Sequence, residues 1–352
     1  MKKGLIFISS LLIVLTLTMV LGSCGGTDVL LPDSEQHAIA FASEEADEEV
    51  MTRASAPLNR DFTVYGYKTV SGSAHVVFDG YNVTYTSGSA GTSVDNTHNY
   101  SYVNGSTQTI KYWDFGASEY NFWGATGGSF ADHGATLTIN DLALSTTEPD
   151  PASTVLFSAL YHRYPVSTDV VRLEFKRPYT KVRVMFYTNM ALTDKPFDNI
   201  KITGITFGPA SPEQIITKGS LKVTYPKRGV EPETYSTEAS DVDKIDKLEF
   251  NDVQLDYEHG TASNNAVTAK PTDESEFYYV VPNDYTTPFT LSAKIDGEDK
   301  TAVVPANFMN WRPNFVYTYI FKISGGKYME LYDVQIDPWK YGGSQEEEWK
   351  NW

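Results

Sequence analysis

The sequence predicts an all-β protein built mainly from short antiparallel strands. Twenty-three Tyr and 18 Phe lie among many Thr and Val residues, and these residue types favour pleated, half-buried strands. Short runs of alternating apolar and polar residues follow one another, separated by Gly, Pro, Asn and Asp. Outside the N-terminal leader, no long stretch repeats its apolar residues with a helical period. The pattern therefore favours β-sandwiches over helical bundles.

The leader, residues 1–23, is typical of a secretory signal peptide. Lys2 and Lys3 precede an apolar run that continues to Leu21, and Gly22-Ser23 supply the small residues of a cleavage site. Cys24, the only cysteine, follows directly. This arrangement resembles the lipobox of bacterial lipoproteins, which implies that Cys24 receives a lipid and becomes the first residue after cleavage. The alternative is an ordinary secretory signal with an incidental cysteine.

Length and charge narrow the possible functions. The 352 residues suffice for about two ordinary domains once the leader is removed. Hydrophobic residues make up 41% of the chain and charged ones 21%, which argues against disorder. Losing Lys2 and Lys3 with the leader moves the formal charge from −17 to −19. Such a charge disfavours nucleic acid and anionic lipid surfaces as partners.

Residues 24–53 are predicted to form a tether that contains one strand. The strand is expected around Ile39 and Phe41, and the acidic run 44–49 after it is expected to be too charged to pack. Arg53 lies among flexible neighbours, where a trypsin-like or arginine-specific protease would reach it. A simple solvated linker is the alternative interpretation of this segment.

Two sandwich domains are expected after the tether, residues 54–177 and 178–352, with a boundary near Arg177-Pro178. Asp79-Gly80 and Asp296-Gly297 are predicted hairpin turns, because this dipeptide suits a type I′ turn. The segment 315–323 is apolar on both faces and is expected in the middle of a sheet.

The last strand-like segment is Tyr328 to Trp339. Its alternation places Tyr332, Val334 and Ile336 on one face and acidic or amide side chains on the other, which predicts a half-buried strand that ends at Pro338.

No catalytic or metal-binding arrangement is predicted. None of the six histidines is paired at metal-ligand spacing, so no metal, cofactor or enzymatic activity is expected. The 45 acidic residues leave room for a pair of glycosidase carboxylates, but solvated acids on outward strand faces are the favoured interpretation. Trp113 and Trp123 have two interpretations: a platform on which a sugar stacks, or a domain core, which is favoured.

Several segments, taken in order, resemble the fimbrillin family of pilins and pilus-associated lipoproteins of Bacteroidetes-type bacteria. They are the lipobox at Cys24, Ala38 to Phe41 with Thr52-Arg53, Tyr112-Trp113 with Tyr120 to Ala125, Val171 to Phe175 with Thr180 to Val184, Trp311 with Tyr317 to Tyr319, and Val334 to Trp339.

The resemblance implies two tandem transthyretin-like β-sandwiches and a structural role in a cell-surface fimbria that serves adhesion. It implies a lipid anchor at Cys24 in the outer membrane, a cut after Arg53, and donor-strand exchange in which the strand 328–339 joins other pilin subunits, in a homo- or hetero-polymer. Shaft, anchor and tip roles stay open, as does a host or bacterial surface ligand. The alternative is a surface lipoprotein that does not polymerise and binds glycans through Trp113 and Trp123.

Overall fold

The computed structural model describes residues 37–45, 58–86, 100–103, 107–188, 199–256, 277–324 and 328–339. Every element in these ranges is a strand except one short 3-10 helix, η2 (Ala306–Phe308), so the all-β prediction is confirmed. The described residues from Ala38 onward form one compact unit. Within the described ranges, no helix has the length and apolar character needed to cross a membrane.

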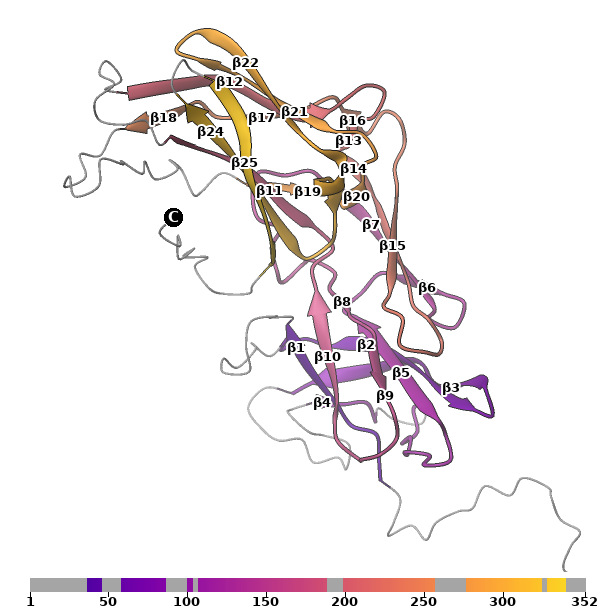
Figure 1. Ribbon diagram of the computed structural model, residues 1–352. Coiled ribbons are helices and arrows are strands. Elements are labelled where there is room, and N and C mark those ends of the chain that lie inside the picture. The colour runs from indigo at the N-terminus through magenta and orange to yellow at the C-terminus, as the bar shows by residue number, and fades with distance from the viewer. Residues whose placement is uncertain are drawn as a thin grey trace, which may run out of the picture. The chain divides into compact units, whose positions relative to one another are not determined.

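The first half of the chain forms an eight-stranded sheet (Figure 1). Its strand order is β1-β10-β8-β5-β2-β3-β4, with β9 beside β5. One face packs on a cluster rich in aromatic rings, among them Phe62, Phe78 and Phe122. The strand bounds are β1 (Phe41–Glu45), β2 (Phe62–Val70), β3 (Ser73–Tyr85), β4 (Tyr100–Ser101), β5 (Glu119–Ala125), β8 (Phe157–Ser158), β9 (Tyr161–Arg163) and β10 (Val171–Lys176).

The predicted turn at Asp79-Gly80 is wrong, because β3 continues straight through this dipeptide. The chain reverses instead at Ser71-Gly72, where φ is 51° and 76°. Gly80 has a φ of 73° and is the extra residue of a bulge in the pairing with β2. Glycine reaches a positive φ without a Cβ clash, so Asp-Gly suits a bulge inside a strand as well as a hairpin turn.

The second half of the chain folds around a core shared by two sheets, β19-β11-β24-β25 and β17-β12-β21-β22, with β18 beside β12. The predicted turn at Asp296-Gly297 is confirmed, since Ile295 pairs with Glu298 across it. The bounds are β11 (Thr180–Thr188), β12 (Asn199–Pro209), β17 (Leu248–Phe250), β18 (Val253–Asp256), β19 (Tyr278–Val280), β21 (Phe289–Ile295), β22 (Glu298–Val304), β24 (Phe315–Ser324) and β25 (Tyr328–Pro338); two short pairs are β13 (Ile215–Ile216) with β16 (Lys244–Ile245) and β20 (Asn283–Asp284) with β23 (Asn310–Trp311).

A further sheet takes strands from both sides of Arg177. Its order is β15-β14-β7-β6, with bounds β6 (Ser129–Ala131), β7 (Thr136–Ala143), β14 (Lys218–Thr224) and β15 (Thr234–Glu238). The β7–β14 pairing joins the two halves by main-chain hydrogen bonds across the predicted domain boundary. The division into domains 54–177 and 178–352 stays a prediction.

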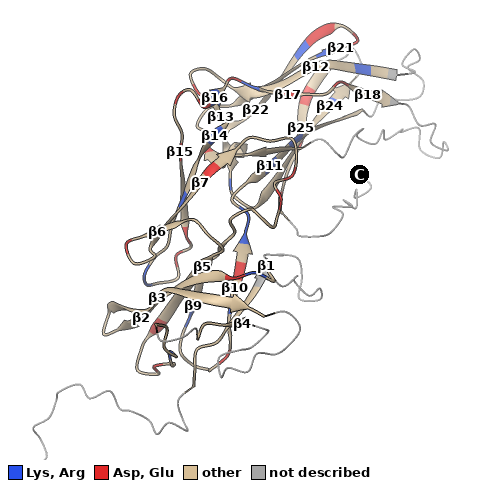
Figure 2. Cartoon of the chain, turned by 180° about the vertical axis from the view of Figure 1, so that it is seen from behind, with Lys and Arg blue, Asp and Glu red and all other residues tan. Residues whose placement is uncertain are grey.

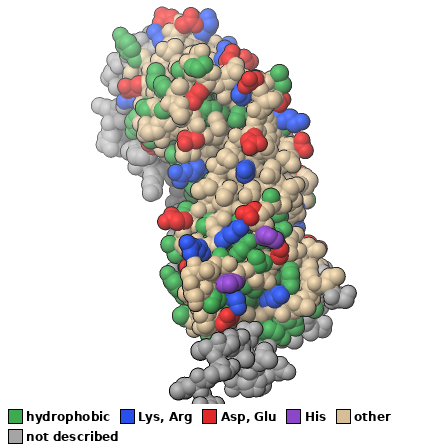
Figure 3. Space-filling view, turned by 90° about the vertical axis from the view of Figure 1, so that its right-hand side faces the viewer, with side chains coloured by type: hydrophobic (Ala, Val, Ile, Leu, Met, Phe, Trp, Pro, Cys, Tyr) green, Lys and Arg blue, Asp and Glu red, His purple; other side chains and the backbone are tan. Residues whose placement is uncertain are grey.

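Charged residues are dispersed over the strands and turns of both halves (Figure 2). In the face shown in Figure 3, acidic and basic side chains lie interspersed with hydrophobic ones. Among the described residues, pairs of opposite charge include Lys68–Asp114 (2.7 Å) and Lys227–Asp132 (3.0 Å). That face therefore carries no large field of a single sign.

Candidate functional site

Two edge strands, one near each end of the described chain, form the candidate site. The first is β1, which pairs in parallel with β10 from Phe41 opposite Val171 to Glu45 opposite Phe175 (Figure 1). The sequence placed a strand around Ile39 and Phe41 and expected the acids from residue 44 onward not to pack. That second expectation stays a prediction, but the main chain of Glu44 and Glu45 pairs with that of Glu174 and Phe175, so the strand extends into the start of the acidic run.

The ring of Phe41 lies at the centre of the aromatic core. Its centroid is 5.1 Å from that of Phe78, 5.9 Å from that of Tyr102 and 6.0 Å from that of Phe122, in edge-to-face geometry each time. Ile39 and Phe41 are only 0% and 1% exposed. We call the buried residues that receive these two side chains the β1 seat: Phe78, Tyr102, Phe122, Val171 and Leu173.

Polar contacts fix the register of β1 over its seat. The N–H of Ile39 donates to the carbonyl of Lys111 at 2.8 Å, and the N–H of Val171 donates to the carbonyl of Ala40 at 2.8 Å. The Ser43 hydroxyl donates to the Tyr100 hydroxyl at 2.6 Å in a buried position. Burial raises the pKa of Tyr100, and the hydrogen bond from Ser43 only partly offsets this effect. The phenol therefore stays protonated at neutral pH.

The second edge strand is β25, which pairs antiparallel with β24 over ten residue pairs, from Phe315 opposite Pro338 to Ser324 opposite Tyr328. It lies at the end of its sheet, beside β24 only (Figure 1). Along its whole length only Met329 is buried, and Trp339 directly after it is the next fully covered side chain. Main-chain pairing therefore contributes more to the docking of β25 than side-chain burial does.

The predicted common face of Tyr332, Val334 and Ile336 is interrupted in the structure. Val334 and Ile336 lie opposite the core residues Tyr319 and Tyr317, but the register shifts between Ile320 and Phe321 and leaves Tyr332 as the extra residue. The Tyr332 ring packs 4.7 Å from that of Tyr187, on the other face. A bulge of one residue reverses the alternation, which a strict period of two cannot show. Tyr332 and Ile336 are each 42% exposed, while Val334 is half-buried against the core.

Both tryptophans proposed for sugar stacking are buried, which is the interpretation that the sequence favoured. Trp123 lies between the rings of Tyr67 (5.6 Å) and Tyr225 (4.9 Å), stacked on both faces, and its Nε1 donates to the carbonyl of Gly134 at 2.7 Å. The Arg163 guanidinium lies 4.7 Å from the ring centroid of Trp113. Neither indole offers a free face to a pyranose.

A row of buried cations is the feature that the sequence did not reveal. Arg177 lies before β11, Lys181 and Arg183 lie within it, and all three are buried. Aromatic rings cover them: Phe277 lies over Lys181 and Arg183, and Trp339 over Arg177 and Lys181. Burial lowers the pKa of Lys181 against the opposing effect of Glu148.

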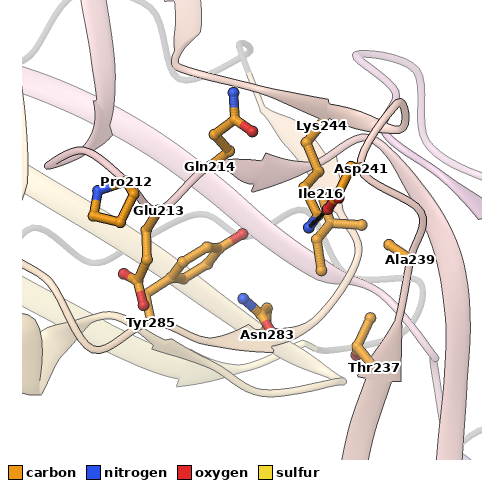
Figure 4. Close-up of a pocket in the computed structure, with 10 residues that line it drawn as sticks. All are labelled: Pro212, Glu213, Gln214, Ile216, Thr237, Ala239, Asp241, Lys244, Asn283 and Tyr285. Carbon is orange, nitrogen blue, oxygen red and sulfur yellow. Dashed lines mark hydrogen bonds and ion pairs between the residues drawn. The ribbon is translucent and has the colours of Figure 1, made fainter.

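A polar hollow of about 420 Å³ lies where the β13–β16 pair meets β20 and Tyr285, which follows it (Figure 4). Thr286 and Thr287 each donate an N–H and a hydroxyl to the Glu213 carboxylate, at 2.6–3.0 Å. Burial alone would raise the pKa of Glu213, but these bonds lower it to about 2. Asp241 pairs with Lys244 at 2.8 Å. Neither acid is poised to exchange a proton near neutral pH, and among the described residues no cluster of three or more His, Cys, Asp or Glu could hold a metal.

The two processing residues lie outside the described residues. Cys24 precedes the described ranges, and Arg53 falls in the chain between β1 and β2. Their lipidation and cleavage stay predictions. The position of Arg53 in the sequence means that a cut there would separate β1 covalently from every other strand.

Solved structures with a similar fold come from Bacteroidetes. A fimbrial protein from Bacteroides vulgatus is 13% identical, with 86% of this chain and 99% of that chain covered and a TM-score of 0.41. A candidate cell adhesion protein from Bacteroides ovatus is 14% identical, with 86% and 96% covered and a TM-score of 0.38. A fimbrial assembly protein from Parabacteroides distasonis is 12% identical, with 86% and 99% covered and a TM-score of 0.33.

No family model matches the sequence. No curated protein matches it either. At these identities and TM-scores the likenesses carry no argument about function, so the function is argued from the residues of this chain.

Proposed function

We propose that this chain is a structural subunit or accessory protein of a cell-surface fimbria, exported as a lipoprotein through Cys24 and assembled by donor-strand exchange. The observation that carries the proposal is the position of β1. Ile39, just before β1, and Phe41, its first residue, complete the aromatic core with their side chains, yet both lie N-terminal to Arg53. A cut after Arg53 would leave β1 held by non-covalent contacts alone.

Loss of β1 would open a groove along β10. The main-chain groups of β10 that now pair with β1 would lose their partners, and the β1 seat would face solvent. An incoming strand can pair with the free main-chain groups of β10 and can also place alternate side chains in the β1 seat. Each large apolar side chain that becomes fully buried contributes roughly 1.5–3 kcal/mol.

The strand β25 has the features of such a donor. Ile336 is 42% exposed in its docked position, so a groove would bury apolar surface that β24 leaves in water. Val334 and Ile336 have the same spacing as Ile39 and Phe41. In an extended strand without the bulge, Tyr332 would join them on one face. Repeated head to tail, this heterologous joint gives an open filament.

The experiment that tests the proposal is mass spectrometry of the mature N-terminus of surface-extracted protein, for the wild type and for Arg53→Ala. We expect the wild type to start at Ala54 and to form high-mass ladders, and Arg53→Ala to lose both. An intact acylated Cys24 in both proteins, without ladders, would contradict a polymerising shaft subunit.

The alternative of a glycan-binding lipoprotein that does not polymerise is not favoured. It requires exposed flat rings at Trp113 and Trp123, and other side chains of the chain cover both.

A further inference from the structure

The C-terminal end of β25 is held by a built contact at Trp339. This residue is 2% exposed, and its N–H donates to the carbonyl of Asn314 at 2.8 Å. Its ring centroid lies 4.8 Å from the Arg177 guanidinium carbon and 5.0 Å from the Lys181 ammonium nitrogen. The Tyr279 ring packs 5.4 Å away. We call these four partners the Trp339 seat.

The Lys181 ammonium in the seat is surrounded by aromatic rings. The Lys181 ammonium lies 4.3 Å from the centroid of Phe277 and 5.5 Å from that of Tyr279, in addition to Trp339. Attraction between a cation and an aromatic face becomes stronger when water is excluded, and Lys181 is only 8% exposed. The ring of Trp339 is thus one wall of the cage around a buried charge, and its departure would expose that charge.

The rest of β25 makes less enclosed contacts: Leu331 and Val334 are only partly buried against the core, and the Tyr332 ring that lies 4.7 Å from Tyr187 is 42% exposed. Tyr328, at its other end, is 70% exposed, and Met329 is the only buried side chain within the strand. The seat also tightens the junction between the two halves, because the N–H of Arg177 donates to Oδ1 of Asn314 at 3.0 Å. Release of β25 therefore requires Trp339 to leave its seat, in addition to separating Met329, Leu331 and Val334 from the core.

We propose that Trp339 and its seat act as a latch, which holds β25 docked on its own β24 until the strand is donated to a second copy of this chain or to a related subunit. The latch has a role in assembly only if β25 is the donated strand, so it rests on the proposed function. Opening the latch would set the population of molecules with a free donor strand, and hence the rate of assembly.

The first test is hydrogen exchange, followed by mass spectrometry, on the monomeric full chain. We compare Trp339→Ala, Trp339→Phe and the matched control Tyr328→Ala with the wild type. We expect amides of 328–338 to exchange about tenfold faster in Trp339→Ala, with partial recovery in Trp339→Phe and no change in Tyr328→Ala, because local opening follows the contact that is lost. Amides of β21 serve as the reference for global unfolding.

Equal exchange of 328–338 in Trp339→Ala and Tyr328→Ala would overturn the latch. So would a rise in Trp339→Ala that β21 shares in full, because the effect would then be global destabilisation. A second measurement follows ladder formation after the cut at Arg53, where Trp339→Ala should assemble faster than the wild type, and an unchanged rate would overturn the gating role. If the wild type forms no ladder at all, the proposed function fails, while the exchange comparison still decides whether Trp339 holds β25.

Discussion

The two edge strands of the candidate site are held in opposite ways. β1 pairs over a short stretch but buries Ile39 and Phe41 completely in the aromatic core. β25 pairs over ten residues yet buries little besides Met329 and, just beyond its end, Trp339. Side-chain pockets therefore define the place of β1, and main-chain pairing defines the place of β25. A strand of the second kind uncovers less of a core when it leaves, here the surface beneath Met329, Leu331 and Val334, and this favours donation.

The largest expected effect is that of truncating Phe41. Phe41→Ala would leave a cavity among Phe78, Tyr102 and Phe122, and we expect it to lower the free energy of unfolding by about 3–5 kcal/mol. Urea denaturation of the uncut full chain measures this value, with Ile336→Ala as the matched truncation in β25. Equal losses in the two variants would show that the two strands do not differ in the way described.

An intermediate effect is expected at the strand that supports β1. Lys176, at the end of β10, forms an ion pair with the buried carboxylate of Glu233 at 2.7 Å. The Tyr235 hydroxyl and the N–H of Leu160 also donate hydrogen bonds to that carboxylate. Burial alone would raise the pKa of Glu233, but Lys176 and the hydrogen bonds lower it below its usual value. This contribution to stability is therefore complete above the unfolded-state pKa and is lost as the pH falls through the folded pKa.

We expect Glu233→Gln to destabilise the chain at pH 7 by about 1–3 kcal/mol and to flatten the loss of stability between about pH 5 and pH 3. Urea midpoints across this pH range measure both effects. Glu298→Gln is the control, because Glu298 pairs with Lys300 on the surface at 3.1 Å. If the stability of Glu233→Gln falls with pH as steeply as that of the wild type, groups other than Glu233 cause the acid sensitivity.

The smallest effect on stability is expected in β25 itself. Ile336→Ala should lower the free energy of unfolding by only about 0.5–1 kcal/mol, because Ile336 is 42% exposed in the docked strand. If β25 is donated, the same change should clearly reduce ladder formation, since Ile336 would then be buried. Thermal denaturation and ladder assays on one preparation separate the two effects. If Ile336→Ala lowers the stability but leaves ladder formation unchanged, Ile336 is buried in the docked strand and not in a donated one, which contradicts the prediction.

Local pattern was a good guide where strands are regular. The alternation predicted the all-β class, the turn at Asp296-Gly297, the strand near Phe41 and the strand 328–339. It failed at Asp79-Gly80 and at Tyr332, where one extra residue forms a bulge. The composition of a bulge overlaps with that of a turn or of a plain strand, so only the partner strand reveals it.

The sequence by itself determined the elements of the candidate site, because strand periodicity and the position of Arg53 after Phe41 are local properties of the chain. It did not determine which charges are buried. The burial of Lys181 and Arg183 depends on Phe277 and Trp339, which arrive from distant parts of the chain. Tertiary structure decided this, since a side chain is buried by whatever packs over it, and those contacts are long-range.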